Sequence, residues 1–497
     1  MLFRSIKMSS IKLPLPAFKH LSHFDRLILG MITILTCLIA LVLWRGDQSV
    51  LRVTQFSWES QKIGVEDQQF SLSFNRPVDH DLVERNLAIK PPLPGKTSWS
   101  GGKLFYTLTE RPIYGINYQI QLQDAKKADG DRALIEPFSS LFSTRDRAFA
   151  YIGITPQERG RLVLFNITQQ KKTLLTPPDL TVTDYAIYPQ GDKIIFSAYE
   201  VAAGSEGKAK QQLYTVTTGL NVQHGGTGER AGKLQTLLGA KDYENQQFEL
   251  SKNGETLIIE RQNPRNPADA GLWALIAGQQ PRPLGIPGGE FVVAPDGKSV
   301  ALSQQGGIAI IPLASEAGGP KFLPGYEKSL GFSPDGSQQL AVKNNGDSRS
   351  LVLLAADGTA KELFKTLNPI VSCEFEPRHQ KLIYCLKTDW VADKKGQYQE
   401  EPYLSAIDLN TGKDMPLLAL PNYRDVQLSM SPDGVALLFD QVVATVANNR
   451  QALIVGDKAI ADGRLWLFTL PELQVGKPSS EILPEQLNPG FKPQWLP

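Results

Sequence analysis

The stretch GFSPDGSQQLAV, residues 331–342, decides the fold. Pro334 sets the φ angle wanted at the first central turn position, Asp335 can hydrogen-bond the backbone ahead of it, and Gly336 accepts a positive φ. The apolar run before this turn and the alternating run after it predict a β-hairpin. A calcium loop would need several oxygen donors at alternate positions, and the segment offers only one carboxylate.

The same hairpin pattern recurs five more times along the chain. Close copies stand at 291–302 and 428–439, and looser ones at 188–196, 250–259 and 375–384. Each copy is followed by a second apolar strand, a turn and a further short strand, as at 350–354, 357–358 and 362–364. Units of about forty residues with four short strands are typical of propeller blades.

These SPDG hairpins resemble the repeats of TolB-type propellers, a WD40-like superfamily with PD40 repeats. The resemblance covers residues 148–497 and implies an all-β propeller, while it says little about function. Seven blades are predicted, with six or eight as alternatives, and they are expected at 148–178, 179–240, 241–287, 288–326, 327–367, 368–421 and 422–487. The C-terminal FKPQWLP places Trp495 in the slot of Phe332, so the last strand is expected to complete blade one and remove exposed sheet edges.

The N-terminal region contains an apolar segment, LILGMITILTCLIALVLW, from Leu27 to Trp44. Eighteen uncharged residues at about 1.5 Å each span about 27 Å, close to the hydrocarbon thickness of a bilayer. The run is longer than that of a cleaved signal peptide, and no small-x-small cleavage site follows it. The sequence therefore predicts one transmembrane helix as a lipid-bilayer anchor.

Five basic residues precede the apolar segment: Arg4, Lys7, Lys12, Lys19 and Arg26. This excess predicts that the tail 1–26 is cytoplasmic and that the rest of the chain is extracytoplasmic. In a bacterium, which the TolB-like repeats suggest, the body would be periplasmic.

A second module is expected at residues 51–145. Short alternating segments at 70–74, 103–106 and 118–122 predict strands of a small β-sandwich. The run FSLSFNRPVD, followed by TSWSGGKLFYTL and YGINYQIQL, resembles bacterial Ig-like domains of the SbsA type. This module would act as a stalk between anchor and propeller.

Composition and motifs argue against several classes of function. A net charge of +1 leaves no basic footprint for nucleic acid. No G-x-S-x-G occurs, and beyond the apolar segment the histidines are His80, His224 and His379, which are not expected to converge. No cofactor or metal site is predicted, and a non-catalytic protein is expected, with an enzyme acting on carbohydrate or peptide in the central channel as the alternative.

Two cysteines flank the hairpin of the sixth repeat. If Phe375 opposes Ile383, then Cys373 opposes Cys385 on one face of the hairpin, where an oxidising compartment would permit a cross-strand disulfide. The alternative is a pair of buried small hydrophobic residues.

Unequal insertions suggest where a partner would bind. The links between second and third strands are long in blades two, three, six and seven, on the face opposite the SPDG turns. Loops on a rigid scaffold concentrate binding residues, and aromatic and Arg side chains favour interfaces. The candidate rim consists of Arg261, Arg265, Trp390, Tyr398 and Arg450. The predicted function is binding of a protein or cell-envelope component, with tolerated insertions that bind nothing as the alternative reading of these loops.

Overall fold

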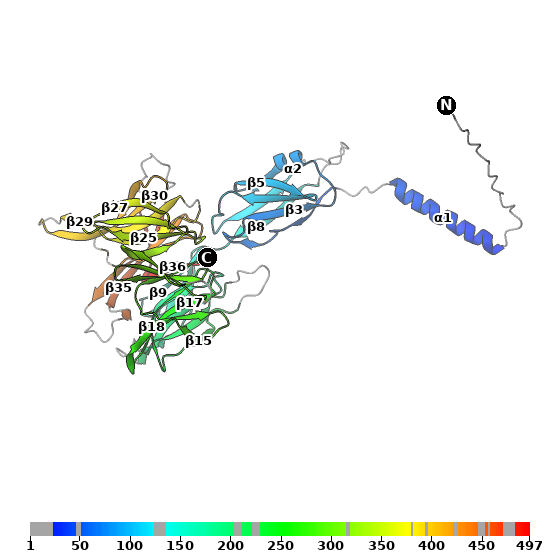
Figure 1. The fold of residues 1–497 in the computed structure, drawn as a ribbon. Coiled ribbons are helices and arrows are strands. Elements are labelled where there is room, and N and C mark those ends of the chain that lie inside the picture. The colour runs from blue at the N-terminus through cyan, green and yellow to red at the C-terminus, as the bar shows by residue number, and fades with distance from the viewer. Residues whose placement is uncertain are drawn as a thin grey trace, which may run out of the picture.

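The computed structural model describes residues 23–45, 51–123, 136–202, 210–220, 229–314, 319–378, 381–392, 396–420, 423, 425–445, 453–455, 458–470 and 483–497. The chain is organised as an N-terminal helix, a β-sandwich and an all-β propeller-like body (Figure 1). The sandwich lies between the helix and the larger body, so the three parts follow one another in space as they do in sequence.

Helix α1 spans His23–Arg45 and so covers the predicted segment. Its described apolar side chains, from Phe24 to Leu41, are exposed. Within the described part of the chain, no helix has both the length and the apolar character needed to cross a membrane.

Two four-stranded sheets form the sandwich. The first has the order β1-β3-β6-β5 and the second β2-β8-β7-β4. Their bounds are Val53–Phe56, Gln69–Phe74, Lys103–Leu108 and Gly95–Ser100 for the first, and Lys62–Ile63, Phe138–Thr144, Asn117–Leu122 and Leu87–Lys90 for the second. The short helix α2, His80–Asn86, is capped by Asp79, whose side chain accepts from Leu82 N. Alternating inward residues such as Phe70, Leu104 and Ile120 fill one shared core.

The body repeats an antiparallel four-stranded sheet. Five separate sheets of this kind are described. They are β12 Leu180–Ile187, β13 Lys193–Glu200, β14 Gln212–Thr217 and β15 Leu234–Leu238; β16 Glu244–Leu250, β17 Thr256–Asn263, β18 Asn266–Ile276 and β19 Arg282–Pro283; β20 Phe291–Val293, β21 Ser299–Gln304, β22 Gly307–Pro312 and β23 Lys321–Pro324; β24 Tyr326–Phe332, β25 Gln338–Asn344, β26 Arg349–Ala355 and β27 Ala360–Thr366; and β28 Ile370–Phe375, β29 Leu382–Ala392, β30 Tyr398–Asp408 and β31 Asp414–Ala419.

A sixth, larger sheet joins the two ends of the body in the order β11-β10-β9-β36-β35-β33-β32, with β34 paired to β35. Its strands are β9 Ala148–Gly153, β10 Leu162–Asn166, β11 Lys171–Leu174, β32 Leu428–Met430, β33 Ala436–Thr445, β34 Leu453–Val455, β35 Lys458–Thr469 and β36 Glu485–Trp495. The first half of β36 pairs with β35 and its second half with β9, with Trp495 opposite Phe149. The prediction that the C-terminal strand completes the first repeat is therefore confirmed.

The first strands of successive sheets contact one another. Such contacts join β12 to β16, β16 to β20, β20 to β24, β24 to β28, β28 to β32 and β32 to β36. Tyr185 on β12 donates to Lys492 O on β36, and Lys492 Nζ lies 2.9 Å from Asp184 Oδ1. These contacts place the first strands at a common hub and leave the later strands at the periphery.

The predicted SPDG hairpin is present between β24 and β25. Ser333 N donates to Gln338 O, Gly336 N donates to Ser333 O, and Asp335 accepts from Ser333 Oγ and Ser337 N. Gly336 adopts φ 72°, as the turn requires. The neighbouring repeats pack through apolar faces, for example Leu340 and Leu351 in one core cluster with Phe375 of the next sheet.

Candidate functional site

The link expected as a loop at residues 389–401 is largely a two-stranded arm. Strands β29 and β30 run on past the sheet, with Trp390 opposite Glu400 and Ala392 opposite Tyr398. Strand β28 reaches β29 only as far as Lys387, and β31 reaches β30 only as far as Tyr403. Beyond these points, residues 389–392 and 398–401 pair with no other described strand, so both edges of the arm are open.

One face of the arm carries its aromatic side chains. Residues directly opposite on two strands share a face, as do residues two apart, so Trp390, Tyr398 and Glu400 lie together. Trp390 is 55% exposed and Tyr398 71% exposed. Thr388 Oγ1 donates to Glu400 Oε1 at 2.9 Å, which fixes that carboxylate at the base of the face.

The other face of the arm is also acidic. It carries Asp389 opposite Glu401, beside the exposed Val391. Asn368 donates to Asp389 and Gln399 donates to Glu401, so both carboxylates are held in place. The described part of the arm thus combines two exposed aromatic rings with three oriented carboxylates.

Arg261 does not lie on an exposed rim, which corrects the sequence expectation. It is only 8% exposed, because β17 continues to Asn263 and keeps residue 261 inside the sheet. Its guanidinium lies 4.7 Å from the ring centre of Tyr243 and 4.9 Å from that of Trp273, and its Nε donates to Asn245. Arg261 therefore packs as a buried cation against two aromatic rings that also contact each other.

The remaining rim residues are not brought together. Arg265 is exposed at the turn of the β17–β18 hairpin, on a different sheet from the arm. Arg450 lies outside the described residues. The blade-seven insertion is partly folded, since Leu453 on β34 is buried in one cluster with Leu180 and Val182. Of the predicted rim, the structure joins only Trp390 and Tyr398.

Cys373 and Cys385 are opposite each other on β28 and β29, as the hairpin spacing predicts. Their sulfur atoms are joined in a disulfide, and both residues are buried. The pair lies in the core cluster between the fifth and sixth repeats, at the root of the arm.

A joint between sandwich and body was not recognised in the sequence. It comprises residues 145–147, between β8 and β9. Arg145 pairs with Glu66 and Lys62 with Asp146, while Arg147 Nη2 lies 3.3 Å from Asp433 Oδ2. Each residue of the joint is therefore held by an ion pair.

Asp146 and Asp433 are the acidic centres of this joint. Burial alone would raise the pKa of Asp146, but hydrogen bonds from Asn166 and Lys62 lower it below its ordinary value. Asp433, the turn aspartate of the last SPDG copy, is 1% exposed and accepts from Tyr114 N at 3.0 Å. A residue that the repeat explains as a turn former thus also binds the sandwich.

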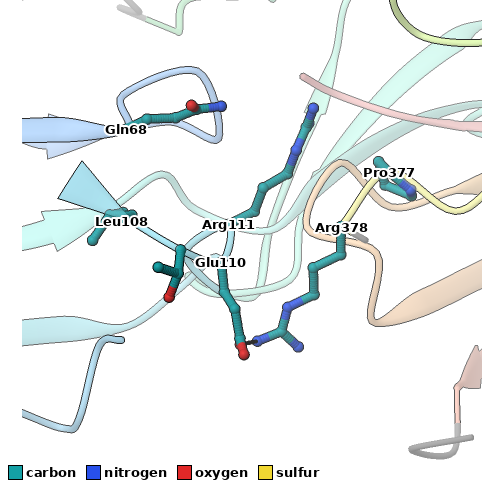
Figure 2. A pocket seen from close by; sticks show the side chains of 7 residues that line it. Gln68, Leu108, Glu110, Arg111, Pro377 and Arg378 are labelled. Atoms are coloured by element: carbon teal, nitrogen blue, oxygen red, sulfur yellow. Dashed lines mark hydrogen bonds and ion pairs between the residues drawn. The ribbon is translucent and has the colours of Figure 1, made fainter. Parts of the chain in front are cut away.

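A polar pocket of about 180 Å³ opens beside this joint. Figure 2 shows its lining residues, with a dashed line between Glu110 of the sandwich and Arg378 of the body. These two side chains are 2.6 Å apart. Its walls come from both domains: Gln68, Leu108, Thr109, Glu110 and Arg111 on one side, Pro377 and Arg378 on the other.

Two carboxyl groups on first strands at the hub have raised pKa values. Burial raises the pKa of Glu249 on β16 to about 7, and burial also raises the pKa of Glu374 on β28. A hydrogen bond from the Val293 backbone acts to lower the pKa of Glu249, and the positive charge of Lys252 acts to lower the pKa values of both carboxyls. Among the described residues, no three His, Cys, Asp or Glu side chains are grouped closely enough to hold a metal ion.

The histidines do not form a catalytic group in the described residues. His80 stacks on Trp99 with ring centres 3.9 Å apart. His224 and His379 lie outside the described residues.

Comparison with known proteins gives structural neighbours only. No protein-family model matches the chain, and no curated protein matches it in sequence. TolB from Acinetobacter baumannii is 14% identical, with a TM-score of 0.38 and 83% of each chain covered. A putative 6-phosphogluconolactonase from Bacteroides uniformis is 12% identical, with a TM-score of 0.43, covering 70% of this chain and 99% of that one. A prolyl endopeptidase is 10% identical, with a TM-score of 0.44, covering 76% of this chain and 50% of that one. The neighbours thus include enzymes as well as TolB.

Proposed function

We propose that this chain is a TolB-like, seven-bladed propeller on an Ig-like stalk that binds a protein of the cell envelope without catalysing a reaction. The blade count is supported by the first strands at the hub, which are β12, β16, β20, β24, β28, β32 and the second half of β36. The stalk is supported by the two facing sheets of the sandwich.

We also propose that residues 27–44 anchor the chain in a membrane, with residues 1–26 in the cytoplasm. This proposal rests on the eighteen uncharged residues and on the basic flank of the sequence. Protease added outside spheroplasts should then digest the propeller, whereas an epitope placed at the N-terminus should survive. Loss of the N-terminal epitope in intact spheroplasts would refute this orientation.

The observation that carries the binding function is the arm formed by β29 and β30. Trp390 and Tyr398 would bury a large apolar area on a partner at little cost in side-chain entropy. Their acidic surroundings favour a partner segment rich in Lys or Arg, because opposite charges steer association and set specificity. The same carboxylates disfavour docking on an anionic lipid surface.

The open edges of the arm suggest how such a segment would bind. An extended peptide can add to an exposed strand through main-chain hydrogen bonds, while alternate side chains select the sequence. A basic segment added beside residues 389–392 would place its cations near Asp389 or Glu400.

Site-specific photo-cross-linking in intact cells tests this function. A cross-linker at position 398 should capture a protein through a peptide that contains Lys or Arg. Trp390→Ala should abolish the adduct, whereas Phe322→Ala, at a 49% exposed aromatic residue on another sheet, should leave it intact. An adduct that survives Trp390→Ala, or the absence of any adduct, would refute the assignment.

The second candidate function is an enzyme acting on carbohydrate or peptide in the central channel. It is favoured by Glu249 and Glu374, two hub carboxyls with raised pKa values under the influence of one lysine. A general acid with a pKa near 7 would suit hydrolysis at neutral pH. Hydrolysis of glycan or peptide libraries by the wild type, and its loss in Glu249→Gln, would replace the first proposal with this one.

A further inference from the structure

The pocket between the sandwich and the body contains an uncompensated cation. Glu110 pairs with Arg378, while the guanidinium of Arg111 makes no hydrogen bond or ion pair with any described residue. In Figure 2, the side chain of Arg111 extends away from the Glu110–Arg378 pair. The pocket lining therefore has one net positive charge, carried by a residue of the sandwich.

Arg378 adds a second positive charge to the pocket lining, although its guanidinium pairs with Glu110 and its Nε atom is buried from solvent. Arg111 is therefore the cation of the pocket that lacks a partner among the described residues. An oxyanion is the acceptor that guanidinium groups match best, because their N–H groups lie in a planar fork.

We propose that this pocket binds the carboxylate or phosphate group of an anionic ligand, held by the guanidinium of Arg111. The volume of about 180 Å³ equals roughly six water molecules and is below the range of pockets that enclose a whole drug-sized ligand. The site therefore fits one anionic group of a ligand whose remainder lies outside.

The position of the pocket gives binding a structural consequence. Arg111 belongs to the sandwich, whereas Pro377 and Arg378, in the turn between β28 and β29, line the pocket from the body, so an anion bound to Arg111 would lie between the two domains. A ligand that binds only the docked arrangement stabilises it by mass action. Anion binding would thus strengthen the attachment of the stalk to the propeller, independently of the β29–β30 arm.

Calorimetric titration of the full chain in detergent tests the site, with inorganic phosphate and acetate as separate probes. At least one anion should bind saturably, and Arg111→Gln should weaken its affinity about tenfold, equal to about 1.4 kcal/mol. Arg111→Lys should fall between, because it keeps the charge and loses the fork. The matched control Arg265→Gln removes an exposed arginine on another sheet and should leave the affinity unchanged.

Hydrogen exchange provides the second readout. The bound anion should slow amide exchange at residues 108–115 in the wild type and not in Arg111→Gln. Binding of only phosphate or only acetate would identify the group and support the site. Equal affinities of wild type and Arg111→Gln, or no saturable binding of either anion up to about 10 mM, a weak-affinity limit, would overturn the proposal.

Discussion

Replacing Asp433 should undock the sandwich from the propeller. In Asp433→Ala, the buried Tyr114 N–H loses its acceptor at 3.0 Å, and Arg147 loses its partner at 3.3 Å. A buried donor left unsatisfied costs about 1–3 kcal/mol. The ion pair adds at most about 1 kcal/mol, because Arg147 is 30% exposed and solvent screens it. The docked arrangement should therefore lose about 1–4 kcal/mol.

Asp335 provides the matched control, because it occupies the same position in another SPDG turn. Its carboxylate accepts only from Ser333 and Ser337 of its own turn. Asp335→Ala should then cost about 1 kcal/mol of local turn stability and leave docking intact. The loss of about 1–4 kcal/mol of docking energy in Asp433→Ala corresponds to roughly a 5- to 700-fold rise in the undocked population.

Trypsin cleavage measures that population directly, because Arg145 and Arg147 are themselves cleavage points in the joint. When undocking is fast compared with cleavage, the cleavage rate follows the open population. Cleavage between the domains should accelerate at least about fivefold in Asp433→Ala and stay unchanged in Asp335→Ala. Asp433→Asn, which keeps one acceptor oxygen but no charge, should lie between them. Equal cleavage rates in wild type and both alanine variants would refute this account of the joint.

Three further predictions concern the body of the propeller. Glu249 has a pKa of about 7 in the folded state against an ordinary 4.5, so the folded state binds its proton more tightly than the unfolded state does. The free energy of unfolding should therefore fall by up to about 3 kcal/mol as pH rises from 4.5 to 7. Denaturant unfolding should show that this pH dependence is reduced in Glu249→Gln and kept in the control Glu290→Gln. The Cys373–Cys385 disulfide closes a loop with a sequence separation of 12 and should contribute about 3 kcal/mol to the free energy of unfolding. Mass spectrometry of unreduced peptides should find the linked pair. An intact pair of free thiols in protein from cells would count against the disulfide. Arg261→Lys should cost about 1–2 kcal/mol in thermal unfolding, because an ammonium lacks the planar guanidinium that packs against both rings. The substitution should leave cross-linking at the arm unchanged.

The repeat architecture was predictable because its signal is local. A Pro-Asp-Gly turn and the alternating strand beside it determine a hairpin within a dozen residues, and six copies reveal the period. The pairing of β36 with β9 follows from the same pattern, since Trp495 occupies the slot of Phe332. The opposition of Cys373 and Cys385 required only the register of one hairpin.

The candidate site was only partly predictable because side-chain exposure depends on how far each strand continues. Arg261 was expected in a loop, but β17 extends past it and two aromatic residues from other segments, Tyr243 and Trp273, enclose it. Trp390 and Tyr398 remain exposed because neighbouring strands end before the arm does. A single sequence does not indicate how far a strand continues beyond the edge of its sheet.

The joint between sandwich and body was not predicted for a different reason, which a comparison of Asp335 with Asp433 shows. Both follow Ser-Pro and precede Gly, so local chemistry assigns both the same turn role. They differ only in what lies above the turn: Asp335 bonds its own serines, whereas Asp433 accepts from Tyr114 of another domain. The repeat determines where each aspartate stands, and the docked sandwich determines which one becomes a contact. The face of the body that carries the SPDG turns is therefore not uniform. The turn at Asp433 keeps the backbone of the repeat, but its carboxylate makes a contact between the two domains.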